Sequence, residues 1–238
     1  VPDDFSTIQA GIDDASDGDT VLVDQGVYFE NLIIQKTITL TSYAIYDDLS
    51  VWYEQDIEYQ ITNDNISNTV INGSNDTNGA NFQSVILIDS PANECISPTI
   101  FGFTITGGDG TLHTYVGSGG TVEDRIGGGI LSNNADPRIN YNYLTNNNGD
   151  VEAGGLDEGG AIKMGTDIDW SASLMHNKDN MHSNRDCSGN IDLSHNFYRN
   201  NNALYGNTLS TWEFEGFLDM SSSIFDVYNC PDTTVTPV

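Results

Sequence analysis

Basic side chains are the scarcest class in this sequence. Its 238 residues include 7 Lys and Arg against 35 Asp and Glu, so the formal net charge at pH 7 is −28. Proteins that bind nucleic acids use clustered Lys and Arg, whereas here these residues occur singly along the chain. The composition therefore argues against nucleic acid as a partner, and against a bare anionic membrane equally.

Long hydrophobic runs are also missing. No stretch approaches the roughly 20 apolar residues of a membrane-spanning helix, so we expect no membrane insertion. The start of the chain lacks the basic and apolar regions of a signal peptide, and Val1 is expected to be a processed or trimmed start. With 37% hydrophobic and 18% charged residues, the chain is expected to be globular.

Cysteine is rare, and its spacing leaves two arrangements open. Cys95, Cys187 and Cys230 lie too far apart for a zinc motif. A disulfide between Cys187 and Cys230 would close 43 residues and leave one free thiol; in the chain-entropy model such a loop contributes about 4 kcal/mol. The alternative is three reduced thiols in the core.

A helical pattern is confined to the start of the chain. Ser6 and Gln9 form a capping box, and apolar residues follow at helical spacing, which predicts a short helix over 6–16. The 26 Asp and 24 Gly residues favour turns over helices further along. Short β-branched runs separated by polar turns then predict strands within 20–23, 27–34 and 36–42.

The later chain repeats itself. Residues 142–148 read NYLTNNN and residues 196–202 read NFYRNNN, 54 residues further on, with Leu144 in register with Tyr198. Units of this size cannot bury their own apolar faces, but stacked units can, which predicts a solenoid. We expect the Asn runs at its turns to adopt left-handed backbone conformations and to bond one another between coils. Related units lie at 102–108, 172–178 and 223–229.

These segments resemble a known family. Residues 5–42 look like the amino-terminal cap and first coils of extracellular right-handed parallel β-helix proteins of the pectin-lyase-like superfamily, and 84–89, 102–108 and 127–148 resemble its later coils. The resemblance implies an all-β chain, with 1–238 as a single right-handed parallel β-helix domain that ends in a coil and tail at 211–238. It implies no particular activity, because the superfamily includes lyases, hydrolases, tailspikes, adhesins and surface proteins without a known reaction.

Residues 43–62 interrupt the coils with four Tyr, one Trp and five acidic residues. One interpretation is a binding platform for sugar rings or a neighbouring subunit. The alternative is a folded flap whose aromatic side chains cover the side of the solenoid. Residues 211–217 alternate aromatic and acidic residues, as expected for a strand that caps the last coils or pairs with another chain. The candidate binding or assembly residues are Tyr46, Trp52, Tyr53, Tyr59, Trp212, Phe214 and Phe217.

Candidate catalytic residues come from the resemblance alone. Lyases of the superfamily pair a Lys or Arg base with acidic Ca²⁺ ligands. Lys163, with Asp167 and Asp169 as metal ligands, fits that pattern locally, and a second group is Lys178, His182 and Arg185. The favoured alternative for Lys163 is an outward, solvated side chain.

The Asn-x-Ser/Thr sequons and two acidic segments each allow a functional interpretation and one without a specific function. Asn65, Asn72 and Asn75 begin Asn-x-Ser/Thr sequons, which are glycosylation acceptors or chance matches in an Asn-rich chain. The segments DGD at 17–19 and DID at 167–169 offer alternate carboxylates to Ca²⁺, but no complete Ca²⁺ loop is present. Solubility of the turns is the alternative.

The sequence favours a secreted or cell-surface structural or adhesive protein. Its expected partners are further copies of itself, in filaments for instance, or an extracellular polysaccharide, with Ca²⁺ as a candidate aid. No complete catalytic set is evident, so an enzyme is the less favoured reading. The alternative function is a polysaccharide lyase or another carbohydrate-active enzyme.

Overall fold

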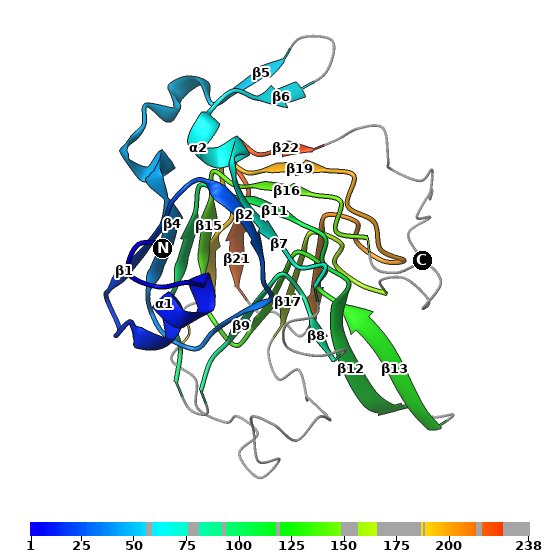
Figure 1. Cartoon of the computed structure of the whole chain (residues 1–238). Coiled ribbons are helices and arrows are strands. Elements are labelled where there is room, and N and C mark those ends of the chain that lie inside the picture. The colour runs from blue at the N-terminus through cyan, green and yellow to red at the C-terminus, as the bar shows by residue number, and fades with distance from the viewer. Residues whose placement is uncertain are drawn as a thin grey trace.

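The chain folds into an all-β structure made mainly of parallel sheets, with few helices (Figure 1). None of the helices in the described part of the chain is long and apolar enough to cross a membrane. The computed structural model describes residues 1–55, 59–75, 81–91, 94–117, 120–148, 157–165, 187, 189–212 and 216–225.

Three parallel sheets form the body of the molecule. Sheet A contains β1 (Thr20–Val23), β4 (Thr39–Ser42), β10 (Thr99–Phe101), β15 (Arg138–Asn140), β18 (Asn190–Asp192) and β21 (Phe217–Asp219). Sheet B contains β2 (Gly26–Phe29), β7 (Thr69–Asn72), β11 (Thr104–Thr106), β16 (Tyr143–Thr145), β19 (Phe197–Arg199) and β22 (Ile224–Phe225). Sheet C contains β3 (Leu32–Ile34), β9 (Ile86–Asp89), β14 (Ile130–Asn133), β17 (Ile162–Gly165) and β20 (Leu209–Trp212).

The chain passes through sheets A, B and C in the same order again and again, and we call each pass a circuit. Equivalent strands of successive circuits pair in parallel, so equivalent side chains stack about 4.8 Å apart. In sheet A, for example, Ile100 lies between Leu40 and Ile139. The inward side chains of all three sheets belong to one buried core. A core shared by every circuit explains why no single circuit needs to be stable alone.

The predicted repeat is confirmed where the structure describes it. Leu144 pairs with Tyr198, and the buried side chains of Asn142 and Asn147 donate to those of Asn196 and Asn201 at 3.3 and 2.9 Å. Asn residues in both runs have positive φ, as expected for left-handed turn positions. The unit at 172–178 lies outside the described residues.

The predicted helix is present as α1 (Ile8–Asp14) and packs against β1 and β3. The predicted capping box is wrong, because the N-cap is Thr7, whose hydroxyl accepts from the Ala10 N–H. The first helical N–H groups are bound instead by the carboxylate of Glu30, at 2.9 and 3.0 Å. An acceptor from the first circuit therefore adds to the local cap at Thr7.

Two excursions leave the sheets. The first contains two 3₁₀ turns, η1 (Tyr43–Tyr46) and η2 (Leu49–Val51), followed by the hairpin β5 (Tyr53–Gln55) and β6 (Tyr59–Ile61) and the short helix α2 (Asp64–Ser67). The second is an antiparallel arm of β8 (Phe82–Gln83), β12 (Gly110–Gly117) and β13 (Gly120–Ile126), which projects beyond the sheets in Figure 1. Phe82 and Ile126 of this arm cover the outer face of sheet C at Leu87 and Leu131.

Candidate functional site

Lys163 lies on the outer face of β17, beside Leu131 of β14 and Ser210 of β20. Its side chain is only 2% exposed, and its Nζ contacts the Glu158 carboxylate and the Ser210 hydroxyl. The expectation that Lys163 is solvated is therefore wrong. Burial disfavours the charge on Glu158, but hydrogen bonds from Lys163 and Ser210 hold the pKa of its carboxyl below the ordinary value.

This geometry does not supply the base of a lyase. Such a base takes a proton directly from the substrate and must be reachable in neutral form, whereas the Lys163 side chain is enclosed and paired with a carboxylate. The second candidate group and both candidate metal ligands of the sequence analysis lie outside the described residues: Lys178, His182, Arg185, Asp167 and Asp169.

A disulfide joins Cys95 to Cys187, whose Cα atoms are 5.3 Å apart at a sequence separation of 92. The predicted pairing of Cys187 with Cys230 is therefore wrong, and Cys230 itself lies outside the described residues. Cys95 precedes β10 and Cys187 precedes β18, and β15 lies between these two strands in sheet A. Because stacking brings turns of different circuits together, proximity in sequence does not identify the partner.

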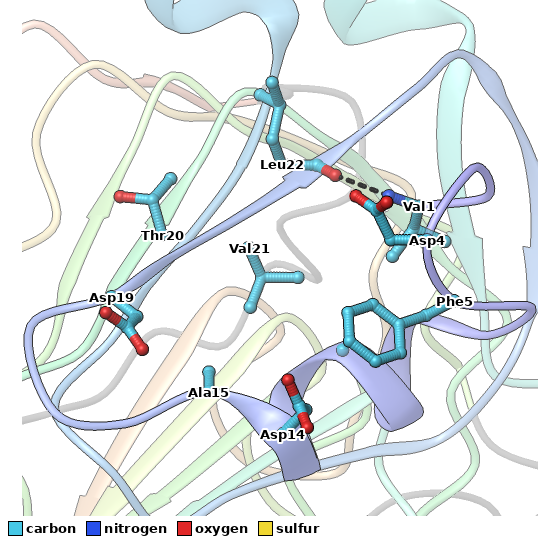
Figure 2. A pocket seen from close by; sticks show the side chains of 10 residues that line it. Val1, Asp4, Phe5, Asp14, Ala15, Asp19, Thr20, Val21 and Leu22 are labelled. Atoms are coloured by element: carbon cyan, nitrogen blue, oxygen red, sulfur yellow. Dashed lines mark hydrogen bonds between the residues drawn. The ribbon is translucent and has the colours of Figure 1, made fainter.

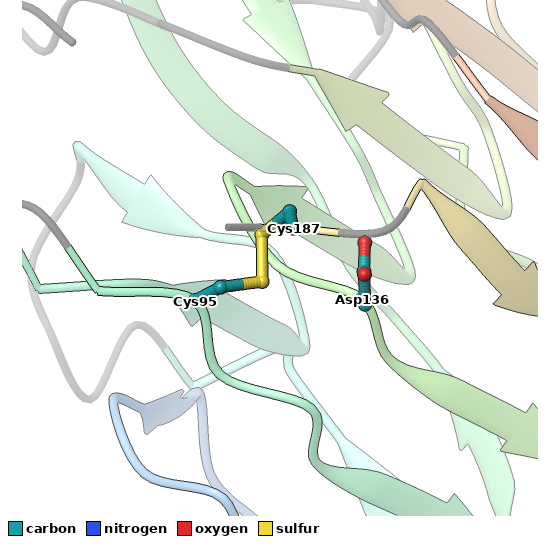
Figure 3. Close-up of side chains that lie close together, drawn as sticks. All are labelled: Cys95, Asp136 and Cys187. Atoms are coloured by element: carbon teal, nitrogen blue, oxygen red, sulfur yellow. A yellow bond between two sulfur atoms is a disulfide. The ribbon is translucent and has the colours of Figure 1, made fainter. Parts of the chain in front are cut away.

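Asp136 lies beside this disulfide (Figure 3). It belongs to the turn at 134–137, whose circuit is stacked between the circuits of Cys95 and Cys187. Its Oδ2 accepts from the Gly189 N–H at 3.2 Å, and its own N–H donates to the Ile96 carbonyl at 2.9 Å. Among the described residues, Cys95, Asp136 and Cys187 are the one group of three potential metal ligands in close contact. While the disulfide is intact, its sulfur atoms are not thiolates and do not bind a metal ion.

The aromatic residues of the first excursion divide into buried and exposed side chains. Trp52 is 3% exposed and packs edge-on against Tyr53 and Tyr141, with ring centroids 5.4 and 5.8 Å apart. This burial favours the flap interpretation for Trp52, because an enclosed indole offers no face to a sugar ring. Tyr46 is 74% exposed, next to Tyr43.

Of the four remaining candidate aromatic residues, the structure describes the side chain of one alone. Phe217 on β21 is 65% exposed. Of Tyr59 and Trp212 only the backbone is described, on β6 and β20, and Phe214 lies outside the described residues. The assembly role of these side chains therefore stays a prediction.

The two ends of the stacked circuits differ. At the first circuit, α1 lies over the core and packs on β1 and β3. At the last described circuit, the core residues Leu218 and Met220 are only partly buried, and Phe225 is exposed and stacked on Tyr198. The described part of the chain thus covers its core at one end and leaves it accessible at the other.

A pocket of about 300 Å³ lies between α1 and β1 (Figure 2). Its walls combine the carboxylates of Asp4, Asp14 and Asp19 with the apolar side chains of Phe5 and Val21. No motif in the sequence indicates this pocket, because its lining comes from separate short segments.

The carboxylates of the DGD segment at 17–19 accept from backbone N–H groups, one in the same turn and one in the neighbouring connection. Asp17 accepts from the Thr37 N–H, and Asp19 accepts from the Ser16 N–H, both at 2.8 Å. These contacts favour the turn interpretation over a Ca²⁺ site.

The three sequons differ in access. The Asn65 side chain bonds Asp47 at 2.8 Å and Gln25 at 3.0 Å, and the side-chain Oδ1 of Asn72 accepts from the Ser74 N–H at 3.0 Å. Asn75 is exposed. Asn75 is therefore the most accessible acceptor of the three.

No family model, curated protein or solved structure matches this chain.

Proposed function

We propose that sheets A, B and C are the three faces of a right-handed parallel β-helix in which each circuit is one coil. The repeated order of the sheets, the parallel pairing of equivalent strands and the single shared core support this architecture. The right hand follows from the strong preference of connections between parallel strands. In this architecture α1 is the amino-terminal cap.

The proposed location is outside the cell or at its surface. The Cys95–Cys187 disulfide supports it, because structural disulfides persist mainly in oxidising compartments. The excess of 35 acidic over 7 basic residues also suits a protein that must stay soluble in a salty exterior.

The proposed function is structural or adhesive: the protein associates with copies of itself through the end formed by β20, β21 and β22. The difference between the two ends carries this proposal. The first circuit is covered by α1, whereas the last described circuit presents Phe217 and Phe225. An uncovered end of stacked strands favours pairing with another chain.

The net charge sets a condition on this association. Copies that each carry a formal charge of −28 repel one another, so contact requires screening by salt or bridging by a divalent cation. Carboxylates are the preferred ligands of Ca²⁺, which makes Ca²⁺ the proposed bridging ion. Asp167 and Asp169 stay candidate ligands.

An extracellular polysaccharide is the second proposed partner. Tyr43 and Tyr46 are exposed on η1 with ring centroids 6.2 Å apart, and the apolar Val51 is exposed nearby in sequence. Exposed aromatic faces combine apolar contact area with a hydroxyl group, which suits sugar rings. Tyr46 then belongs to the glycan surface and Phe217 to the assembly surface.

Sedimentation velocity of matched variants tests the assembly. The wild-type protein is expected to form larger species with rising concentration, more so in millimolar Ca²⁺ than in chelator. Phe217→Asp should weaken association at least tenfold, whereas Tyr46→Asp, which changes the charge equally, should leave association unchanged and reduce retention on polysaccharide columns. If the wild-type protein stays monomeric under all these conditions, the proposed self-association is wrong.

The competing function has its own readout. If uronate polymers incubated with the protein yield an unsaturated product that absorbs in the ultraviolet, the protein is a lyase. The structural proposal predicts no such product.

A further inference from the structure

Three side chains with metal-binding chemistry meet where sheet C connects to sheet A. Cys95, Asp136 and Cys187 come from connections in three successive circuits, and their ligand atoms all lie within 4.8 Å of one another. Figure 3 shows the Asp136 carboxylate next to the two sulfur atoms. In the oxidised protein the two sulfur atoms are bonded to each other as a disulfide.

Backbone contacts hold the three residues together independently of the disulfide. The Asp136 N–H donates to the Ile96 carbonyl, one residue from Cys95, at 2.9 Å. The Gly189 N–H, two residues from Cys187, donates to the Asp136 carboxylate at 3.2 Å. Cleavage of the sulfur–sulfur bond removes neither contact, so the two thiols and the carboxylate stay side by side.

We propose that reduction of the Cys95–Cys187 disulfide converts this connection into a Zn²⁺ site. Two equivalents of a small thiol supply the two electrons and two protons, and leave as one disulfide. Zn²⁺ then displaces the two thiol protons and binds both Sγ atoms and one Asp136 oxygen, with water as the fourth ligand. At about 2.3 Å per Zn–S bond, the sulfur atoms need to separate to roughly 3.8 Å, which side-chain rotation allows.

The donor set selects the metal. Two thiolates and one carboxylate suit Zn²⁺, whereas Ca²⁺ and Mg²⁺ prefer all-oxygen sites. Asp136 is 8% exposed, so its carboxylate faces the sulfur atoms in a largely enclosed space. The hydrogen bond from Gly189 orients this carboxylate as outer-shell donors orient ligands in metal sites.

The disulfide and the metal site exclude each other, because they use the same sulfur atoms. The two cysteines are therefore cross-linked in two ways: by the disulfide when the protein is oxidised, and by Zn²⁺ when it is reduced. In the reduced state the metal replaces the covalent bond across the turn at 134–137 and shields both thiols from oxidation.

Spectroscopic titration with Co²⁺ tests the site. The full chain carrying Cys230→Ser, which removes the third thiol, is reduced with dithiothreitol, desalted without oxygen and titrated. We expect thiolate-to-cobalt charge-transfer bands that saturate at one equivalent and disappear on addition of Zn²⁺. The oxidised protein should give no bands, and Asp136→Asn should weaken binding at least tenfold.

Three results would overturn the proposal. One is the absence of charge-transfer bands in reduced protein whose far-ultraviolet circular dichroism matches that of the oxidised form. A second is undiminished affinity in both the Asp136→Asn and the Cys95→Ser variants, which would indicate that neither residue is a ligand. If reduction unfolds the chain, Co²⁺ must restore the β spectrum, and failure to do so also contradicts the site.

Discussion

The side-chain amide of Gln9 pairs with the backbone of Ile33 as a neighbouring strand would. Its Oε1 accepts from the Ile33 N–H at 2.8 Å, and its Nε2 donates to the Ile33 carbonyl at 3.1 Å. Ile33 belongs to β3, the end strand of sheet C. Helix α1 therefore does more than cover the core: it also satisfies backbone groups on the edge of this sheet, where another chain could otherwise pair.

Replacing Gln9 with Leu tests this edge contact. We expect a loss of about 1–3 kcal/mol of unfolding free energy, because the variant leaves a partly buried N–H and C=O without partners. Urea unfolding followed by circular dichroism measures it. Gln25→Leu is the matched control, since the Gln25 side chain bonds the Asn65 side chain in an exposed setting. Equal stability of the two variants would show that the contact of the Gln9 amide with Ile33 does not contribute to the free energy of unfolding.

We expect the Asn142 side chain to contribute more to the free energy of unfolding than Gln9 does. It is fully buried, accepts from the Phe103 N–H at 3.0 Å, and donates to the carbonyls of Ile100 and Asn140, also at 3.0 Å. Asn142→Leu should cost about 3 kcal/mol, because several buried backbone groups lose their partner together. Asn202→Leu, at an exposed position, should change stability by less than about 0.5 kcal/mol. A similar loss in both variants would contradict a ladder of buried Asn side chains.

The Glu158–Lys163 pair predicts an acid-sensitive contribution to stability. The pKa of Glu158 is lowered in the folded protein, so its contribution is present above the pKa of the unfolded chain and is lost as the pH falls through the folded value. Glu158→Gln should therefore flatten the fall in unfolding free energy below about pH 4.5.

At neutral pH, Glu158→Leu should cost about 3 kcal/mol, because it leaves the buried ammonium of Lys163 without its carboxylate. The double variant Glu158→Leu with Lys163→Met should recover part of that loss. Additive losses in this double-mutant cycle would show that the pair is not coupled.

The disulfide predicts both a thiol count and a stability difference. Denatured, unreduced protein should react with one equivalent of a thiol reagent, and Cys230→Ser should abolish that reaction. Cys95→Ser should cost about 4–5 kcal/mol, the chain-entropy estimate for a loop of 92 residues. If peptide mapping finds no disulfide in the Cys230→Ser protein, that result contradicts the Cys95–Cys187 pairing and supports a Cys187–Cys230 pairing in the wild-type protein.

Local regularity decided which features were predictable. The spacing of 54 residues between the two Asn runs places Leu144 beside Tyr198, because a repeat in sequence becomes a register in stacked strands. The periodic apolar residues of α1 were equally informative. In both cases neighbours in the pattern determine the structure.

Contacts between circuits outside the repeated runs were not predictable. The pairing of Cys95 with Cys187 depends on which connections stack, and the lengths of the intervening excursions conceal this. Sequence rules place a lysine side chain in water, but Glu158, from the connection that precedes β17, and Ser210, from β20, bond the Lys163 side chain. The core of the fold is thus easier to predict from this sequence than its candidate sites.

Electron microscopy of negatively stained protein is the most direct measurement of the proposed assembly. With millimolar Ca²⁺ the account predicts ordered filaments or sheets, which disperse when chelator is added and fail to form in the Phe217→Asp variant. Dispersed single particles of the wild-type protein in both conditions, at concentrations where it is fully folded, would contradict the central claim.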